Sequence, residues 1–516
     1  MTLPIRLSCK HDIPFRINFQ YPIDLLITLA GDNFLTMLNR IIIFILLIFL
    51  LSDITFSFVQ NMQMPLDGDM AESILPAKNY DKIFHDPFGV SVITQHAVYP
   101  NPNRFFAQWI YMKYFRTMPF VLQNFTDPIH SVYLSAAISK TIIYIGILIL
   151  CGFYVTGNYA LLKKEFLFAV VLIIPLFQIN GYRSYMGIID PSITYTFSYA
   201  LPCMLLLLFY LPFFNTSFHQ KIFTTNKIIL FLLFVFAFVI ALSGPLLPGA
   251  VLIITLLYLF RQLILNDKEN KGSSFFQKIF SFFNKIPKAY FLFFGFVSIL
   301  SLYSLFIGRN NSQFILDKIS VSERYSRLPQ GLYLLLTQKI GYPLLLIMIG
   351  INAFLIHKGH KTPEGKKILN LLKWIGIFSI LYISLLPLGG YRSYRPNIIR
   401  YDSIMPITIA LIIFYGLSAY FLITHFQNNA KKVYIAAIIG FSFVYTLADE
   451  PEWDKNKCEI NAFENLASSK VKIVLLENDC SVLAWKKIDD PASSEFNAQL
   501  LQFWGITEEK KLYYQK

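Results

Sequence analysis

Three carboxylates lie close together in the segment from Pro65 to Glu72, directly after the first long apolar run. In this Asp67-Gly68-Asp69-x-x-Glu72 pattern, Gly68 permits a tight turn between the two aspartates. Carboxylates at this spacing share a divalent cation or raise one another's proton affinity, so the segment predicts a catalytic base or a metal clamp. The alternative is a solvated turn before a helix whose acidic first turn is favoured by the helix dipole.

Arginines form the second group of residues that suggests chemistry. Lysines dominate one set of predicted loops, whereas the short loops on the other side are rich in arginine: Arg183, Arg309, Arg324, Arg327, Arg392, Arg395 and Arg400. A guanidinium binds two phosphate oxygens at once, which predicts phosphate recognition on that side, and the alternative is anchorage of helix ends in lipid headgroups. Arg183 and Arg392 each stand in the middle of the same pentapeptide, Gly-Tyr-Arg-Ser-Tyr.

Several isolated polar residues complete the set of candidates. Asp190 places a further carboxylate in the second loop of the arginine-rich side. Lys140 falls within an apolar run, where a cation requires a buried partner or a ligand phosphate unless the helix lifts it to the interface. The secondary candidates are His85, Asp86, His96 and Tyr401.

Composition defines the class of protein. Of the 516 residues, 55% are hydrophobic and only 15% are charged, which predicts an integral membrane protein rather than a soluble one. The net charge of +14 does not indicate a nucleic-acid partner, because the basic residues lie in short loops between apolar runs. Eleven such runs predict an all-α polytopic fold with spans near 41–59, 131–156, 166–180, 194–214, 228–243, 250–265, 289–307, 332–356, 370–388, 403–425 and 433–448.

The loops then predict orientation and domains. By the positive-inside rule the lysine-rich side is cytoplasmic, which places the N-terminus inside and the arginine-rich loops and C-terminus outside. Residues 1–37 form a cytoplasmic segment, and Met37, just before the first span, favours a start codon at that position. Residues 38–449 form the membrane domain, and 450–516 form a small periplasmic domain.

Two of these regions have predicted internal structure. The first outer loop, 60–130, is long enough to carry two short amphipathic helices, at Asp69–Tyr80 and Arg104–Arg116. The C-terminal domain contains two strand-like runs, Val471–Leu476 and Ser481–Trp485, which predict a small α+β fold. Cys458 and Cys480 are its two cysteines and are predicted to form a disulfide in an oxidising compartment.

This arrangement resembles the GT-C superfamily of integral membrane glycosyltransferases, which includes protein O-mannosyltransferases and the aminoarabinose transferase of lipid A. The resemblance lies in a first span followed by Asp67-Gly68-Asp69, short loop helices, about ten further spans, and an Arg-Tyr-x-x-x-x-Pro pattern from Arg400 to Pro406. It implies transfer of a hexosyl or pentosyl group, usually with inversion, from a polyprenyl-phosphate donor. The acceptor would be a lipid, a cell-envelope glycan or a protein at the outer face of a bacterial inner membrane.

The resemblance also implies roles for individual residues. Asp67 or Asp69 matches the first-loop acidic residue that acts as base or cation ligand, and Asp190 matches the second-loop acidic position. Glu72 is the natural third ligand for a cation such as Mg²⁺ or Mn²⁺, and Arg183, Arg392, Arg395, Arg400 and Lys140 are the candidates for phosphate binding. Membrane lipids surround the protein in every interpretation. The alternatives are a transporter or flippase of lipid-linked sugars, and an O-antigen polymerase or ligase that relies on arginines.

Overall fold

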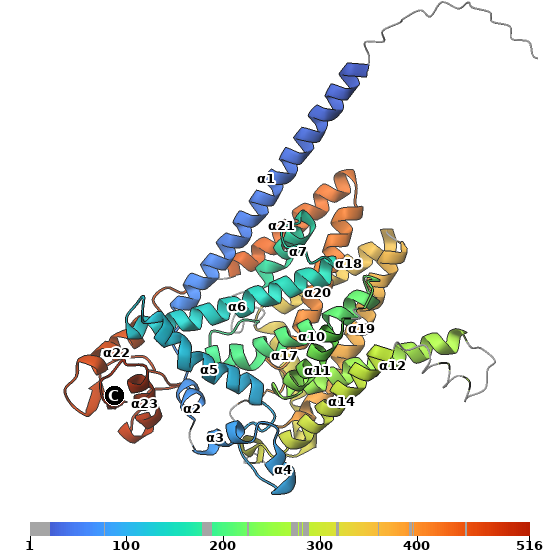
Figure 1. Ribbon diagram of the computed structural model, residues 1–516. Helices are drawn as coiled ribbons and strands as arrows, with labels where there is room; N and C mark the ends of the chain where they lie inside the picture. Colours follow the sequence, from blue (N-terminus) through green and yellow to red (C-terminus); the bar gives the residue numbers. More distant parts are fainter. Residues whose placement is uncertain are drawn as a thin grey trace, which may run out of the picture.

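The computed structural model describes residues 21–76, 78–177, 188–223, 226–269, 277, 281, 288–315, 319–359, 361–391, 395, 397–448 and 451–516. Within these ranges the chain is predominantly α-helical, and two short strands near the C-terminus form a sheet (Figure 1). Two predicted site residues, Arg183 and Arg392, lie outside the described residues, as does most of each Gly-Tyr-Arg-Ser-Tyr pentapeptide.

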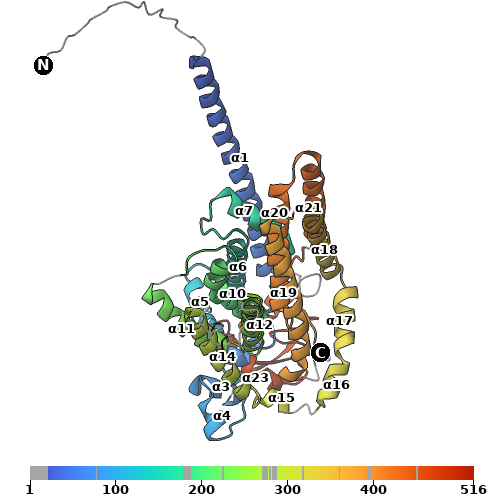
Figure 2. The same cartoon turned by 90° about the vertical axis from the view of Figure 1, so that its right-hand side faces the viewer.

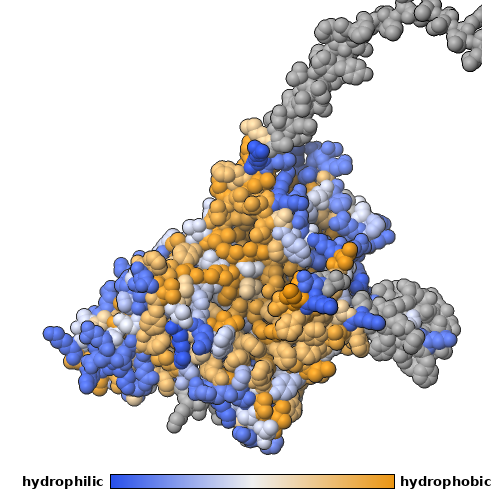
Figure 3. All heavy atoms as spheres, viewed as in Figure 1, coloured by the Kyte–Doolittle hydropathy of each residue, from blue (hydrophilic) through white to orange (hydrophobic). Residues whose placement is uncertain are grey.

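Nine helical segments within the described ranges are long and apolar enough to cross a bilayer. In chain order they are α1 (Tyr21–Met62), α6 (Pro128–Thr156), the segment from α9 to α10 with its π turn (Ile193–Ser217), α12 (Leu246–Glu269), α14 (Lys288–Gly308), α18 (Gly341–Gly359), α19 (Pro363–Leu385), α20 (Met405–His425) and α21 (Asn428–Ala448). Apolar side chains cover the middle of the molecule, and hydrophilic ones gather towards its ends (Figure 3). The chain is therefore a multi-pass membrane protein.

Two of the eleven predicted spans are shorter helices in the described part of the chain. Helix α7 (Lys164–Ile173) has only 10 residues and passes into a 3₁₀ turn that contains Pro175. Helix α11 (Lys227–Ala241) has 15 residues and is about 22 Å long, whereas the hydrocarbon core is about 30 Å thick. Both helices are shorter than the other apolar helices, so neither is among the nine segments long enough to cross a bilayer within one described helix.

Helix α20 is the centre of the bundle. In its most apolar window 83% of the residues are buried, compared with 11% for α1. Helices α6, α7, α18, α19 and α21 all pack against α20. Helix α1 instead runs along the edge of the bundle, and its first half projects beyond the other helices (Figure 1).

The segment between α1 and α6 contains four helices rather than the two that the sequence predicts. The predicted helix Asp69–Tyr80 is interrupted, because Pro76 lacks the N–H that a continuing helix needs. The helices are α2 (Met70–Ile74), α3 (Lys78–His85), α4 (Val90–Thr94) and α5 (Phe105–Leu122). Helices α3 and α4 lie at the same end of the molecule as α15 (Ser312–Ile315) and α16 (Val321–Ser326), and α17 (Leu328–Thr337) connects α16 to α18 (Figure 2).

The C-terminal unit is a small α+β structure. Its elements are α22 (Lys457–Ser468), β1 (Ile473–Leu476), the 3₁₀ turn η4 (Pro491–Ser494), α23 (Glu495–Phe503) and β2 (Leu512–Gln515). The two strands are parallel, with Ile473 opposite Leu512. A disulfide joins Cys458 to Cys480. The segment Ser481–Trp485 is not the strand that the sequence predicts, because Leu483 has a φ of 46° and interrupts the extended backbone.

The C-terminal unit docks on helix α5. Trp504 is fully buried, and its indole N–H donates to the carbonyl of Phe115 at 3.1 Å. Gln123 donates in return to the carbonyl of Trp504 at 2.8 Å, and the rings of Phe120 and Phe503 meet at 5.3 Å. These contacts place the C-terminal unit beside the loop that carries Asp67 and Asp69.

Candidate functional site

Asp67 is buried and bridges the segment between α1 and α6 to the start of α9 (Ile193–Tyr195). Its Oδ2 accepts from the Ser192 hydroxyl at 2.7 Å and from the Thr194 N–H at 2.9 Å. Its Oδ1 accepts from the Thr194 hydroxyl at 2.8 Å and from the Asp69 N–H at 3.1 Å. Burial and the nearby Asp69 charge raise the pKa of Asp67, although these hydrogen bonds oppose the shift. With four donors on two oxygens, Asp67 holds two segments together.

Asp69 stands at the surface of the same turn and is half-buried. Its Oδ1 accepts from the indole N–H of Trp485 at 2.9 Å, so the C-terminal unit contacts the acidic turn directly. Gly68 makes this contact possible, because a Cβ there would lie 2.6 Å from the backbone nitrogen of Trp485. Gly68 is thus required for close approach of the C-terminal unit, in addition to the turn that the sequence predicts.

Lys140 is buried within α6 near two carboxylates. Its ammonium group donates to the carbonyl of Pro191, and the charges of Asp190 and Asp67 act on it. This arrangement matches the predicted alternative in which Lys140 has buried partners. A cation in this position compensates part of the negative charge of the two aspartates.

Asp190 is also buried, and only one of its oxygens has a partner. Oδ1 accepts from the Ser192 N–H at 2.7 Å, whereas Oδ2 is without a hydrogen-bond partner among the described residues. Burial raises the pKa of Asp190 to about 7, with hydrogen bonding and Lys140 opposing the rise and the charges of Asp402 and Asp67 adding to it. Burial thus favours the protonated form of Asp190 more than it does in an exposed aspartate.

Two of the predicted phosphate-binding arginines meet at one carboxylate. Arg400 contacts Asp402 through Nε and Nη2, each at 3.0 Å, and donates from Nη1 to the carbonyl of Asn397 at 2.9 Å. Arg395 reaches the same carboxylate at 3.4 Å. Two guanidinium groups on one aspartate leave a net positive charge, and both side chains are partly exposed.

Two tyrosines connect this arginine pair to the acidic turn. Tyr195 directly precedes a π turn, η2 (Thr196–Ala200), and Tyr199 lies within it; such turns are frequent at functional sites. Arg395 donates to both hydroxyls, at 3.1 Å for Tyr199, and its guanidinium lies 4.6 Å from the centre of the Tyr195 ring. The Tyr195 ring in turn lies 5.5 Å from that of Trp485.

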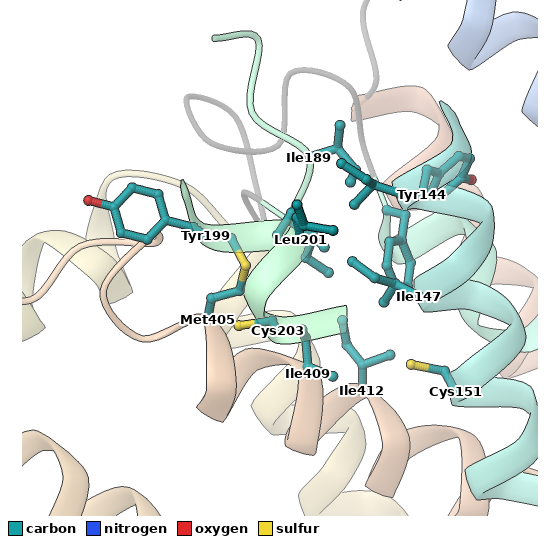
Figure 4. Packing of buried hydrophobic residues seen from close by; sticks show 14 of the residues in the cluster. Tyr144, Ile147, Cys151, Ile189, Tyr199, Leu201, Cys203, Met405, Ile409 and Ile412 are labelled. Atoms are coloured by element: carbon teal, nitrogen blue, oxygen red, sulfur yellow. The ribbon is translucent and has the colours of Figure 1, made fainter. Parts of the chain in front are cut away.

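These contacts form one continuous set of side chains, which we call the polar row. Its members in spatial order are Asp69, Trp485, Tyr195, Arg395, Asp402 and Arg400. The side chains of Leu201, Cys203 and Ile409 belong to the apolar interior, and Tyr199 points away from them (Figure 4). The row therefore has a carboxylate at one end, a guanidinium pair at the other and aromatic rings between.

Glu459 of α22 fixes the position of Trp485. It is buried and accepts from the Leu66 N–H at 2.8 Å, the Tyr133 hydroxyl at 2.8 Å and the Leu483 N–H at 2.7 Å. Burial raises the pKa of Glu459 to about 7 against the lowering effect of these hydrogen bonds. One carboxyl group thus joins the acidic turn, α6 and the segment before Trp485.

The residues predicted to bind a cation do not form a ligand set in the described structure. Asp67 uses both oxygens for hydrogen bonds, Asp69 contacts Trp485, and Glu72 lines a small cavity with Tyr80 and Gln108. Within the described ranges, no three His, Cys, Asp or Glu side chains are arranged to hold a metal ion. The cation therefore remains a prediction.

The secondary candidates lie elsewhere. His85 is exposed and contacts Asp81 at 2.8 Å, and His96 is exposed in a left-handed turn with a φ of 51°. Asp86 caps α4 by accepting from the N–H groups of Val90 at 2.8 Å and Ser91 at 2.9 Å. Although burial acts in the other direction, these hydrogen bonds lower the pKa of Asp86.

Tyr401 follows Arg400 in the chain, but its ring faces Tyr342 at 6.2 Å, inside the bundle.

Other residues of the site were not singled out by sequence reasoning. Ser192 and Thr194 carried only a weak signal, two hydroxyl residues after Asp190-Pro191, and Asp402 stood unassigned beside Arg400. Trp485 and Glu459 carried none, because they lie about 400 residues from the acidic turn that they contact.

No protein-family model, curated protein or solved structure matches the chain. The interpretation of the site therefore depends on its own geometry.

Proposed function

We propose that this protein is a GT-C-type integral membrane glycosyltransferase of the bacterial inner membrane, with the polar row at the outer face. It transfers a hexosyl or pentosyl group from a polyprenyl-phosphate donor to a lipid, cell-envelope glycan or protein acceptor. The observation that carries the proposal is the polar row itself: an accessible carboxylate and a guanidinium pair, far apart in sequence, meet on one network of contacts.

In this mechanism the donor phosphate binds at Arg395 and Arg400. Both arginines contact the same carboxylate, Asp402, which carries one negative charge against their two positive charges. Guanidinium groups bind phosphate oxygens in pairs and stabilise the charge that develops as the phosphate leaves. The Tyr195 and Tyr199 hydroxyls hold Arg395 in position through its hydrogen bonds to both.

Asp69 acts as the base. It is more exposed than Asp67 or Asp190, and Asp67 has both oxygens occupied by donors. Asp69 takes the proton of the acceptor hydroxyl as that oxygen bonds to the anomeric carbon. The bond from this carbon to the phosphate oxygen breaks with its electron pair, and the configuration inverts. Asp67, Asp190 and Lys140 beneath the row hold the two loops together.

The aromatic side chains of Trp485 and Tyr195 lie between the two ends of the row, where the transferred sugar would sit. Their rings present apolar faces beside polar groups, a combination that suits a sugar ring. The C-terminal unit takes part in the site through Trp485.

The test is transfer of radiolabelled sugar from a panel of polyprenyl-phosphate sugars in proteoliposomes, with and without a chelator. The proposal expects a labelled product that differs chemically from the donor and depends on Asp69. Movement of intact donor across the bilayer would instead identify a flippase. Transfer that persists in Asp69→Asn and fails in Arg400→Gln would favour the polymerase or ligase alternative. The chelator decides whether a cation takes part.

A further inference from the structure

A second feature lies inside the helix bundle, away from the polar row. An apolar cavity of about 360 Å³ lies between α10 (Leu201–Ser217), α12, α14, α19 and α20. This volume is within the range of small-molecule sites, roughly 300–1,000 Å³. Along α10 and its C-cap the lining runs from Cys203 to Phe218, which corresponds to about 22 Å of helix. The cavity is therefore long and narrow enough for one lipid chain.

Polar lining residues are concentrated at one end of this cavity. Arg261 of α12, Ser217 at the end of α10, and Lys367 and Asn370 of α19 lie there, on the lysine-rich side of the molecule. The deeper part, towards Cys203 and Pro406, is lined almost entirely by aliphatic and aromatic side chains. The lining thus has the polarity of a single lipid molecule, with a charged end and an apolar end.

The charge at the mouth is net positive. Arg261 and Lys367 are both partly exposed, and their charges act on one another across the opening. Lys367 also donates to the carbonyl of Phe218, and its ammonium lies 4.9 Å from the centre of that ring. Among the described groups whose charges act on Lys367, Glu364 is acidic and Arg261 is basic, so these three side chains carry one net positive charge.

We propose that this cavity binds one anionic glycerophospholipid of the lysine-rich leaflet. One acyl chain fills the apolar part of the cavity, and the phosphate lies between Arg261 and Lys367. A polyprenyl-phosphate donor bound at Arg395 and Arg400 would enter from the apolar end, near Pro406, and would leave Arg261 and Lys367 without an anion. The bound lipid fills the space between five helices, where an empty apolar cavity would cost stability.

The test is native mass spectrometry of the purified full-length protein after detergent exchange, titrated with phosphatidylglycerol or phosphatidylethanolamine. We expect one tightly bound phosphatidylglycerol and at least about tenfold weaker binding of phosphatidylethanolamine, since a hydrogen bond to a charged group contributes roughly 1.5–3 kcal/mol. The double variant Arg261→Gln/Lys367→Gln should lose this preference. Lys366→Gln, an exposed neighbour outside the cavity, should retain it. Ala410→Phe, which fills the cavity, should abolish binding with both cations present.

A photoreactive group at the end of the acyl chain gives a measurement that needs no variant. Phosphatidylglycerol labelled in this way should crosslink near Cys203 and Pro406, the deep end of the cavity. Equal binding of both lipids, unchanged binding in the double variant, or crosslinks confined to outward-facing residues would each overturn the proposal. Competition by polyprenyl phosphate for the same crosslink would assign the cavity to the donor instead.

Discussion

Thr194 donates two hydrogen bonds to Asp67, one from its hydroxyl at 2.8 Å and one from its backbone N–H at 2.9 Å. This pair joins the segment between α1 and α6 to the start of α9, across 127 residues of sequence. Asp67 therefore has a positioning role, distinct from that of Asp69, and the two aspartates should respond differently to substitution.

Replacing Asp67 by asparagine should destabilise the protein. The amide has an NH₂ group where Asp67 has an oxygen that only accepts, so at least one donor from Ser192 or Thr194 loses its partner. The expected loss is about 1–3 kcal/mol, seen as a lower melting temperature in detergent. Thr194→Val should cause part of this loss, whereas Thr194→Ser retains the hydroxyl and should resemble wild type. An unchanged melting temperature in Asp67→Asn would contradict the role given to this carboxylate.

Gly68→Ala should separate the C-terminal unit from the acidic turn. The new Cβ would lie 2.6 Å from the backbone nitrogen of Trp485 and 2.9 Å from the backbone carbon of Ala484, neither of which moves without its segment. We expect a loss of about 1–3 kcal/mol and a transfer rate as low as that of Trp485→Ala. Gly505→Ala is not a suitable control, because its φ of 73° brings strain of its own, but Gly295→Ala is, since nothing lies within 4 Å of its added Cβ.

Glu459 should make the stability of the protein depend on pH. Its pKa is about 7 in the folded protein, against 4.5 in the unfolded chain, so the folded state binds more protons between these values. The free energy of unfolding contributed by this group therefore falls as the pH rises from about 4.5 to about 7. Glu459→Gln should reduce the difference in melting temperature between pH 5 and pH 8. Glu464→Gln, exposed on the same helix, should leave that difference as in wild type.

Asp86→Ala should affect stability and not catalysis. The substitution removes the side-chain acceptor of two N–H groups at the start of α4, a loss of about 1 kcal/mol. Transfer per folded molecule should stay at the wild-type rate, as it should in His85→Ala and His96→Ala. If any of these three variants had a much lower transfer rate and an unchanged melting temperature, the site would lie near α3 and α4 and not at the polar row.

The sequence predicted a membrane protein and most of its helices, because the length of an apolar run can be read directly from neighbouring residues. The exceptions have local causes that compete with hydropathy. Pro175 ends the apolar run at α7, Pro76 divides the predicted helix after Asp69, and the left-handed backbone of Leu483 interrupts a predicted strand. Hydropathy also does not fix the length of a helix, and α11 has only 15 residues where the sequence predicts a span.

The candidate site was predicted only in part. Asp69 was recognisable because three carboxylates lie close together in the sequence. Arg395 and Arg400 were recognisable because the loops on one predicted side of the membrane are rich in arginine. Their partners were not, because Trp485 reaches Asp69 across 416 residues and Tyr195 reaches Arg395 across 200. Contacts at such separations depend on how helices pack, and a single sequence does not encode them in any local pattern.

The central claim is that Asp69 acts in chemistry and the arginine pair binds the donor phosphate. The most direct measurement compares donor binding with the rate of single-turnover transfer in Asp69→Asn, Arg400→Gln and the control Asp81→Asn, a half-buried residue of α3. We predict that Asp69→Asn binds donor normally but transfers about 10²–10⁴-fold more slowly. Arg400→Gln should weaken binding of the donor, and Asp81→Asn should match wild type. Wild-type transfer rates in Asp69→Asn, with the protein folded and the donor bound, would contradict the account.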